Sequence, residues 1–139
     1  MEKACAGCGA CSHPPQFPQF HPGRPPVPIC RLSGEQGAFD NTHLLIAASC
    51  TAYACCEFHQ RFVRSRTVLI GCPDADHSDY LSKLSAVIAE NDIKTITLVR
   101  MESACCDALA SAVRAALRGS EKFIPWQIIT LHPDGSVAE

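Results

Sequence analysis

The stretch His43-Leu-Leu-Ile-Ala-Ala-Ser49 decides the fold class of this chain, because it is a short apolar run that leads directly into a helix-compatible segment. Continuous apolar runs of this length are typical of strands that are buried on both faces of a parallel sheet. Thr67-Val-Leu-Ile-Gly71 has the same character, and so do residues 94–100 and 126–131. We therefore expect four strands, spaced at regular intervals along the chain.

The segments between these runs carry helical patterns. We expect helices over residues 51–63, 78–90 and 103–118, with Asn91 closing the second and Ser103 capping the third. Strands that alternate with helices form right-handed crossovers. The chain is therefore predicted to be an α/β protein with a small, mostly parallel four-stranded sheet in βαβαβαβ order, flavodoxin-like or Rossmann-like in outline.

The first 40 residues differ in composition from the rest. They hold seven of the ten prolines and five of the eight glycines, so they favour polyproline II or an irregular arm over a helix. The segment has too little apolar mass to order itself, and we expect a metal bound by its cysteines to organise it. We predict a Cys/Pro-rich metal-binding arm over 1–40 and an α/β domain over 41–139.

Composition argues against several classes of partner. The net charge of −2 does not provide the excess of positive charge that binds nucleic acid. No apolar run approaches the roughly 20 residues that cross a bilayer. The start of the chain lacks the apolar segment of a secretory signal, so we expect a cytoplasmic protein whose thiols stay reduced. The basic cluster Arg61, Arg64 and Arg66 is interpreted as a solvated helix end, with a partner-docking patch as the alternative.

Ten cysteines are the main chemical signal. Six of them follow the expected strands: Cys50, Cys55, Cys56, Cys72, Cys105 and Cys106. In a parallel sheet these junctions lie side by side at the carboxyl edge, where helix N-termini favour thiolates and anionic clusters. The pattern predicts an iron–sulfur cluster there, most simply [4Fe–4S]. Adjacent residues on a helix point about 100° apart, so one of Cys55 and Cys56 is expected to face the crevice and the other to pack as a thiol. The alternative is that both bind a cluster larger than a cubane.

The other cysteines lie in the arm, at Cys5, Cys8, Cys11 and Cys30. The first three have the spacing that opens the bacterial ferredoxin ligand run, but the usual fourth cysteine before a proline is absent, and Cys30 is remote. Three close cysteines and a remote one suit a second [4Fe–4S] cluster, with tetrahedral zinc as the alternative. Whether arm and sheet edge form two centres or one larger cluster is left open.

The segments around the sheet-edge cysteines resemble a group of small, ferredoxin-annotated iron–sulfur proteins of anaerobic bacteria and archaea. The resembling segments are Ala48-Ser-Cys-Thr-Ala-Tyr-Ala54 with Phe58-His59, Ile70-Gly-Cys-Pro-Asp74, Asn91-Asp-Ile-Lys-Thr-Ile96, and Met101-Glu102 followed by Cys105-Cys106. The resemblance spans about residues 43–119. It implies cluster binding through Cys50, Cys72, Cys105 and Cys106, and it implies no known reaction.

The sequence thus predicts an iron–sulfur protein that transfers single electrons or senses redox state in an anaerobic cytosol, with a redox partner protein. One alternative is a zinc-binding module with a structural or metal-sequestering role. Another is a thiol or persulfide enzyme that uses Cys105-Cys106 or Cys55-Cys56, since adjacent cysteines form strained, reducible disulfides.

Overall fold

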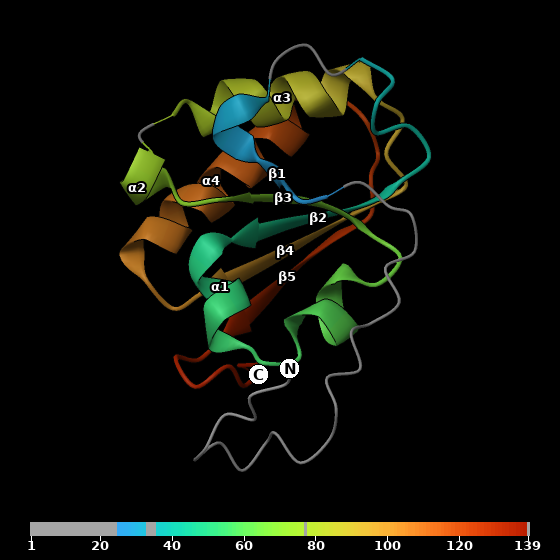
Figure 1. The fold of residues 1–139 in the computed structure, drawn as a ribbon. Coiled ribbons are helices and arrows are strands. Elements are labelled where there is room, and N and C mark those ends of the chain that lie inside the picture. Colours follow the sequence, from blue (N-terminus) through green and yellow to red (C-terminus); the bar gives the residue numbers. More distant parts are fainter. Residues whose placement is uncertain (1–24, 33–35, 77, 139) are drawn as a thin grey trace.

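A parallel sheet of five strands lies at the centre of the computed structural model, which describes residues 25–32, 36–76 and 78–138 (Figure 1). In chain order the strands are β1 (Val27–Pro28), β2 (His43–Ala48), β3 (Thr67–Gly71), β4 (Thr95–Met101) and β5 (Trp126–Leu131). The helices are α1 (Ser49–Ala54), α2 (Pro73–Asp76), α3 (Tyr80–Glu90) and α4 (Ala104–Gly119). Two shorter turns are the 3-10 turn η1 (Ile29–Arg31) and the π-helical turn η2 (His59–Val63).

The strand order is β1-β3-β2-β4-β5, and every pair is parallel. From β2 the chain crosses to β3 on one side and then to β4 on the other side of β2. The direction of winding therefore reverses between β2 and β4. In open parallel sheets, the carboxyl ends of the strands at such a reversal form the crevice that most often holds a ligand.

The four strands that the sequence predicts are all present, but the sheet has a fifth. Val27 and Pro28 form β1, which pairs with Leu69 and Ile70 of β3. A proline is tolerated in an edge strand because its missing N–H faces away from the partner. The expectation of four strands was therefore wrong by one, because a two-residue strand is too short to leave a periodic pattern.

Residues that precede position 41 contribute to the core of the sheet domain. Ile29 and Phe39 are fully buried, and both belong to the large apolar cluster beneath α3 and α4. The metal-binding arm predicted over 1–40 is only partly covered by the described residues. Cys5, Cys8 and Cys11 lie outside them.

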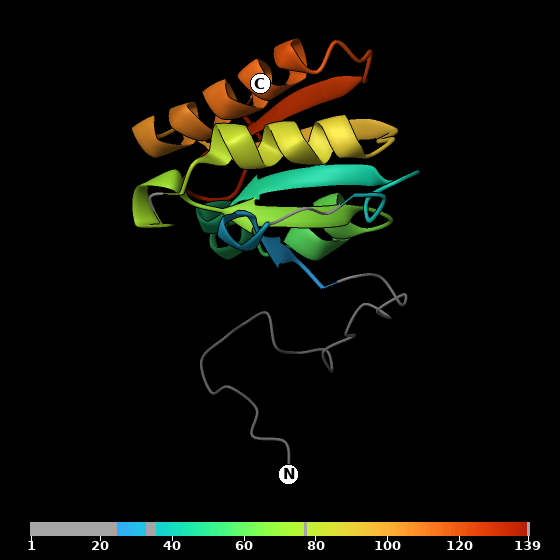
Figure 2. The ribbon, with the colours of Figure 1, turned by 90° about the horizontal axis from the view of Figure 1, so that it is seen from above.

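Helices cover both faces of the sheet. Figures 1 and 2 show α3 and α4 side by side on one face, while α1 and η2 lie on the other. On β2 the side chains alternate between these layers, because Leu44 and Ile46 join the cluster under α3 and α4, and Leu45 and Ala47 join the smaller one beneath η2. This double burial explains the continuous apolar run of the sequence.

The helix expected over 51–63 is broken. It ends at Ala54, Cys55 is extended, and the chain resumes as the π-helical turn η2. The break lies where the C-terminal turn packs against the backbone: a Cβ on Gly135, whose φ is +88°, would come within 3.0 Å of the Ala54 carbonyl carbon and overlap its oxygen. A contact between distant parts of the chain thus overrides the local helical pattern.

The helix expected over 78–90 is shorter at its start. Asp79 is its N-cap and accepts a hydrogen bond from the Ser82 amide at 3.1 Å, so α3 begins at Tyr80. A further short helix, α2, precedes it. Among the described residues, no helix is both long enough and apolar enough to cross a membrane.

Candidate thiol site at the carboxyl edge of the sheet

Cysteines follow four neighbouring strands of the sheet at the carboxyl edge. Cys30 comes two residues after β1, Cys72 directly after β3, Cys50 two residues after β2, and the Cys105-Cys106 pair a few residues after β4. Because all strands are parallel, these junctions lie along one edge of the sheet. The strand ends that these cysteines follow are therefore neighbours at the edge where the sequence predicts the site.

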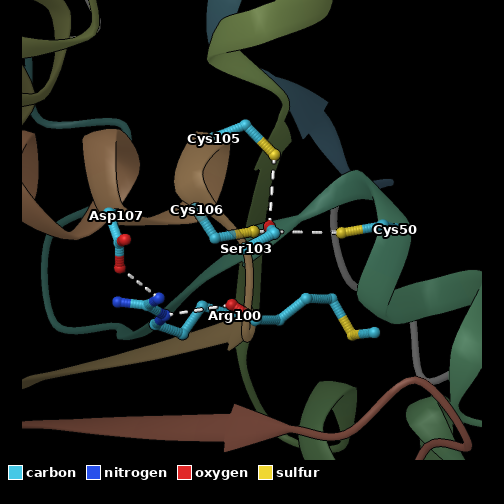
Figure 3. A network of polar contacts seen from close by, with 7 residues as sticks. Cys50, Arg100, Ser103, Cys105, Cys106 and Asp107 are labelled. Atoms are coloured by element: carbon cyan, nitrogen blue, oxygen red, sulfur yellow. Dashed lines mark hydrogen bonds and ion pairs between the residues drawn. The ribbon is translucent and has the colours of Figure 1, made fainter.

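The closest contact joins the two strands at which the winding reverses. The Cys50 Sγ lies 3.9 Å from the Cys106 Sγ, so one thiol donates a hydrogen bond to the other (Figure 3). Cys50 is in the first turn of α1 and is exposed, whereas Cys106 is in the first turn of α4 and is buried. The contact therefore joins a residue at the surface to a residue in the core, and the contact itself is partly buried.

Cys105 is held by a different neighbour. Ser103 occupies the N-cap position of α4, as predicted, but its side chain makes no capping hydrogen bond. Its hydroxyl instead lies 3.2 Å from the Cys105 Sγ (Figure 3). The short contact makes Ser103 part of the thiol site.

The two kinds of surroundings move thiol acidity in opposite directions. Burial, followed by the charge of Cys106 and the hydrogen bond with it, raises the pKa of Cys50 to about 11. The Ser103 hydroxyl is the main reason that the pKa of Cys105 is lowered, despite the opposing effects of burial and of the Asp74 charge. Cys105 therefore loses its proton at lower pH than Cys50.

An ion pair fixes the start of α4 against the end of β4. Arg100, on β4, pairs with Asp107 in the first turn of α4 (Figure 3). The Arg100 Nε also donates to the Met101 carbonyl at 3.2 Å. A carboxylate in the first turn of a helix is favoured by the helix dipole, so Asp107 suits this position. These contacts orient the turn that carries Cys105 and Cys106.

Cys72 and Cys30 lie farther along the edge. Cys72 is half-buried, and its carbonyl accepts a hydrogen bond from Ala75 at 3.1 Å as α2 begins. Cys30 is also half-buried, and its carbonyl accepts from Lys83 Nζ at 2.7 Å. The sequence predicts Cys30 as part of the arm. The short apolar stretch Val27-Pro-Ile29 before it is the signal that could have assigned it to a strand end.

Cys55 and Cys56 differ from the thiols at the edge. Cys55 is buried in the apolar cluster with Phe58 and Phe62, on the face covered by η2. Cys56 is exposed. Within the part of the chain that the structure describes, no group of three His, Cys, Asp or Glu side chains is arranged to hold a metal ion.

Comparison with known proteins bears on the fold. A search of curated proteins and a search of solved structures each returned no match. The model of a family described as a Rossmann-like domain matches residues 36–139, which is more than half of the chain. The matched region contains four of the five parallel strands and every cysteine of the edge except Cys30. The chain therefore belongs to the family of Rossmann-like domains.

Proposed function

We propose that this chain is an iron–sulfur protein whose cluster is bound by thiols at the carboxyl edge of its sheet. The proposed ligands are Cys50, Cys72, Cys105 and Cys106. The proposed role is transfer of single electrons to a partner protein, or sensing of redox state, in an anaerobic cytosol. The resemblance to small ferredoxin-annotated proteins supports this choice of chemistry.

The observation that carries the proposal is the 3.9 Å contact between the Cys50 and Cys106 sulfurs at the reversal between β2 and β4. Two thiols from elements that are 56 residues apart meet at the place where this fold most often binds a ligand. Core cysteines are ordinarily packed singly among apolar side chains. An exposed thiol that contacts a buried one fits a ligand-binding role better.

The cysteine sulfurs at this edge are the donor atoms that an iron–sulfur cluster requires, since such clusters are held by cysteine thiolates. When bound, the cluster would supply the capacity to gain and lose single electrons. Cys105 releases its proton more readily than Cys50, because Ser103 lowers the pKa of Cys105 whereas burial and Cys106 raise that of Cys50. Binding is therefore expected to release protons, and deprotonation of Cys50 to cost more than that of Cys105.

The arm enters the proposal as a second centre. Cys5, Cys8 and Cys11 have the spacing described above, and Cys30 lies next to Cys72 in the order of strand ends. Cys30 is therefore the cysteine through which arm and edge would be joined in one larger centre. Zinc remains the alternative metal for the arm.

The test is to purify the chain without oxygen, to count iron, acid-labile sulfide and zinc, and to record electron paramagnetic resonance after reduction. Iron and sulfide in equal amounts, with the resonance of a reduced cluster, are expected. In Cys72→Ala, loss of the entire signal would indicate a single shared centre, and partial loss would indicate two. A colourless protein that carries zinc, or no metal at all, would contradict the proposal.

A second function is favoured by the same contact: Cys50 and Cys106 could act as a redox dithiol. To form a disulfide, the two sulfurs would approach from 3.9 Å to about 2.0 Å. Both thiols would lose their protons, and the two electrons released would reduce a small-molecule disulfide to two thiols. This pair differs from the adjacent pairs expected from the sequence.

The two functions are separated by metal removal. After exposure of the metal-free chain to oxidised glutathione, a redox dithiol gives a product that is lighter by two hydrogens, with a disulfide between Cys50 and Cys106 in its peptide map. Release of two glutathione thiols per chain from the metal-free protein, together with this disulfide, would support the second function. A mixed disulfide with glutathione, with no internal bond, would rule it out.

A further inference from the structure

A groove with both polar and apolar lining residues lies at the edge of the sheet opposite the thiols. Its volume is about 530 Å³, within the range of about 300–1,000 Å³ that is typical of small-molecule sites. It is formed where β2, β4 and β5 begin and where the chain enters β3. Its lining includes His43, Arg64, Arg66, Thr95, Thr97 and Gln127.

Polar side chains lie where a buried parallel sheet would ordinarily be apolar. Thr97 is on the central part of β4 and is only 3% exposed, and the Gln127 side-chain amide lies 3.5 Å from its hydroxyl. At the start of the neighbouring strands, the His43 Nδ1 lies 2.8 Å from the Thr95 hydroxyl. These side chains give the groove a lining that can donate and accept hydrogen bonds.

Two arginines come from an unusual loop. The π-helical turn η2 ends with a hydrogen bond from the Arg64 amide to the His59 carbonyl at 3.1 Å. Ser65 then adopts a positive φ of 62°, which is uncommon for a residue other than glycine. Both π-turns and such backbone outliers are enriched at functional sites. Here they place Arg64 and Arg66 beside the start of the sheet.

The charge of the groove is one-sided. Among the described residues that line it there are two arginines and one histidine, and there is no Asp or Glu. The chain as a whole has a net charge of −2, so this concentration of positive charge is local. Guanidinium groups bind phosphate and carboxylate oxygens through paired hydrogen bonds.

We propose that this groove binds a small molecule that carries an oxyanion, either a phosphate or a carboxylate group, with Arg64 as the main charge contact and Gln127 and Thr97 as hydrogen-bonding neighbours. The groove is larger than a bare phosphate ion requires, so the ligand is expected to be an organic anion. Arg66 is partly committed to structure, since its NH1 donates to the Phe62 carbonyl at 2.9 Å.

The groove and the thiol site lie at opposite ends of the strands and share no residue. The proposal therefore does not depend on the cluster. It can fail while the iron–sulfur proposal stands, and the reverse also holds.

The test is isothermal titration calorimetry on the full chain in a buffer without oxyanions. The ligands are inorganic phosphate, AMP, citrate and, as a neutral comparison, adenosine. Tighter binding of AMP would identify a phosphate ligand, and tighter binding of citrate a carboxylate ligand. In Arg64→Gln the affinity for the better anion is expected to fall by about tenfold or more. Arg61→Gln changes a third arginine of the same segment, which does not line the groove, and should bind as the wild type does.

Circular dichroism of both variants establishes that they are folded. The proposal is overturned if none of the three anions binds at millimolar concentration. It is equally overturned if adenosine binds as tightly as the better of the anions, or if Arg64→Gln binds that anion as the wild type does.

Discussion

At the scale of single residues, two thiols in the same edge of the sheet have different acidities. Burial and the neighbouring Cys106 raise the pKa of Cys50 to about 11, while Ser103 lowers the pKa of Cys105. Cys50 is nevertheless the more exposed of the two. Exposure and acidity therefore predict opposite orders of alkylation for Cys50 and Cys105, so the measured order shows which of the two properties controls the reaction.

In the reduced, metal-free chain at pH 8, iodoacetamide is expected to alkylate Cys105 at least about tenfold faster than Cys50, because the thiolate is the reactive form. The rate at Cys50 should keep rising with pH towards about 11, whereas the rate at Cys105 should level off below 9.0. Tandem mass spectrometry of peptides sampled over time measures both rates. Ser103→Ala is the control and should slow Cys105 alone. Faster alkylation of Cys50 than of Cys105 would contradict the prediction, because it would show that exposure, and not thiol acidity, sets the order of alkylation.

A second residue-scale prediction concerns Gly71, which ends β3 directly before Cys72. A Cβ at this position would overlap the hydroxyl of the buried Tyr80 and come within 2.9 Å of its ring. Gly71→Ala should therefore cost about 1–3 kcal/mol of the free energy of unfolding, the scale of overpacking in a core. Gly119→Ala meets nothing within 4 Å at the end of α4 and should be neutral or stabilising by up to about 1 kcal/mol. Urea unfolding followed by circular dichroism measures the free energy of unfolding of both variants. Equal values for the two variants would contradict the predicted overlap with Tyr80.

At the scale of elements, apolar continuity predicted the four long strands, because strands covered on both faces leave a simple signal in the sequence. It failed where a contact between distant segments decides the structure. The helix expected over 51–63 breaks at Cys55 because the turn at Gly135 packs against it. The strand β1 has only two residues, so nothing periodic marks it.

The candidate site, like the fold, was predicted only where local sequence and topology determine it. Topology was enough to predict that Cys50, Cys72 and the Cys105-Cys106 pair follow neighbouring strands. The direct contact between Cys50 and Cys106 depends on how α1 and α4 begin, which no local pattern specifies. The groove at Arg64 was missed because its lining comes from the starts of separate strands.

Asn91 illustrates how one side chain joins elements. It was predicted only as the end of α3, but it is buried and links two segments: its Oδ1 accepts from the Phe39 amide at 2.8 Å, and its Nδ2 donates to the Val87 carbonyl at 2.8 Å. Asn91→Ala should cost about 2–4 kcal/mol, since it leaves a donor and an acceptor unpaired. Asp92→Ala, which changes an exposed neighbour, should stay within about 0.5 kcal/mol of wild type in thermal or urea unfolding. A similar small loss in Asn91→Ala would mean that water replaces both hydrogen bonds.

At the scale of the whole molecule, the sheet separates two kinds of chemistry. Sulfur lines the carboxyl edge, where four strand ends are each followed by cysteine, and positive charge lines the groove at the amino edge. The core between them is apolar on both faces of the sheet. The two sites share no residue, so matched substitutions can assign a function to each edge.

The central claim, that thiols at the carboxyl edge hold an iron–sulfur cluster, is tested most directly by counting iron and acid-labile sulfide in Cys106→Ala beside Cys56→Ala, both purified without oxygen. Cys106 contacts Cys50 at the reversal of the sheet, whereas Cys56 is an exposed thiol outside the proposed ligand set. We predict that Cys106→Ala loses the iron, the sulfide and the resonance of at least one cluster, while Cys56→Ala keeps the full content of the wild type. Unchanged iron and sulfide in Cys106→Ala would contradict the account.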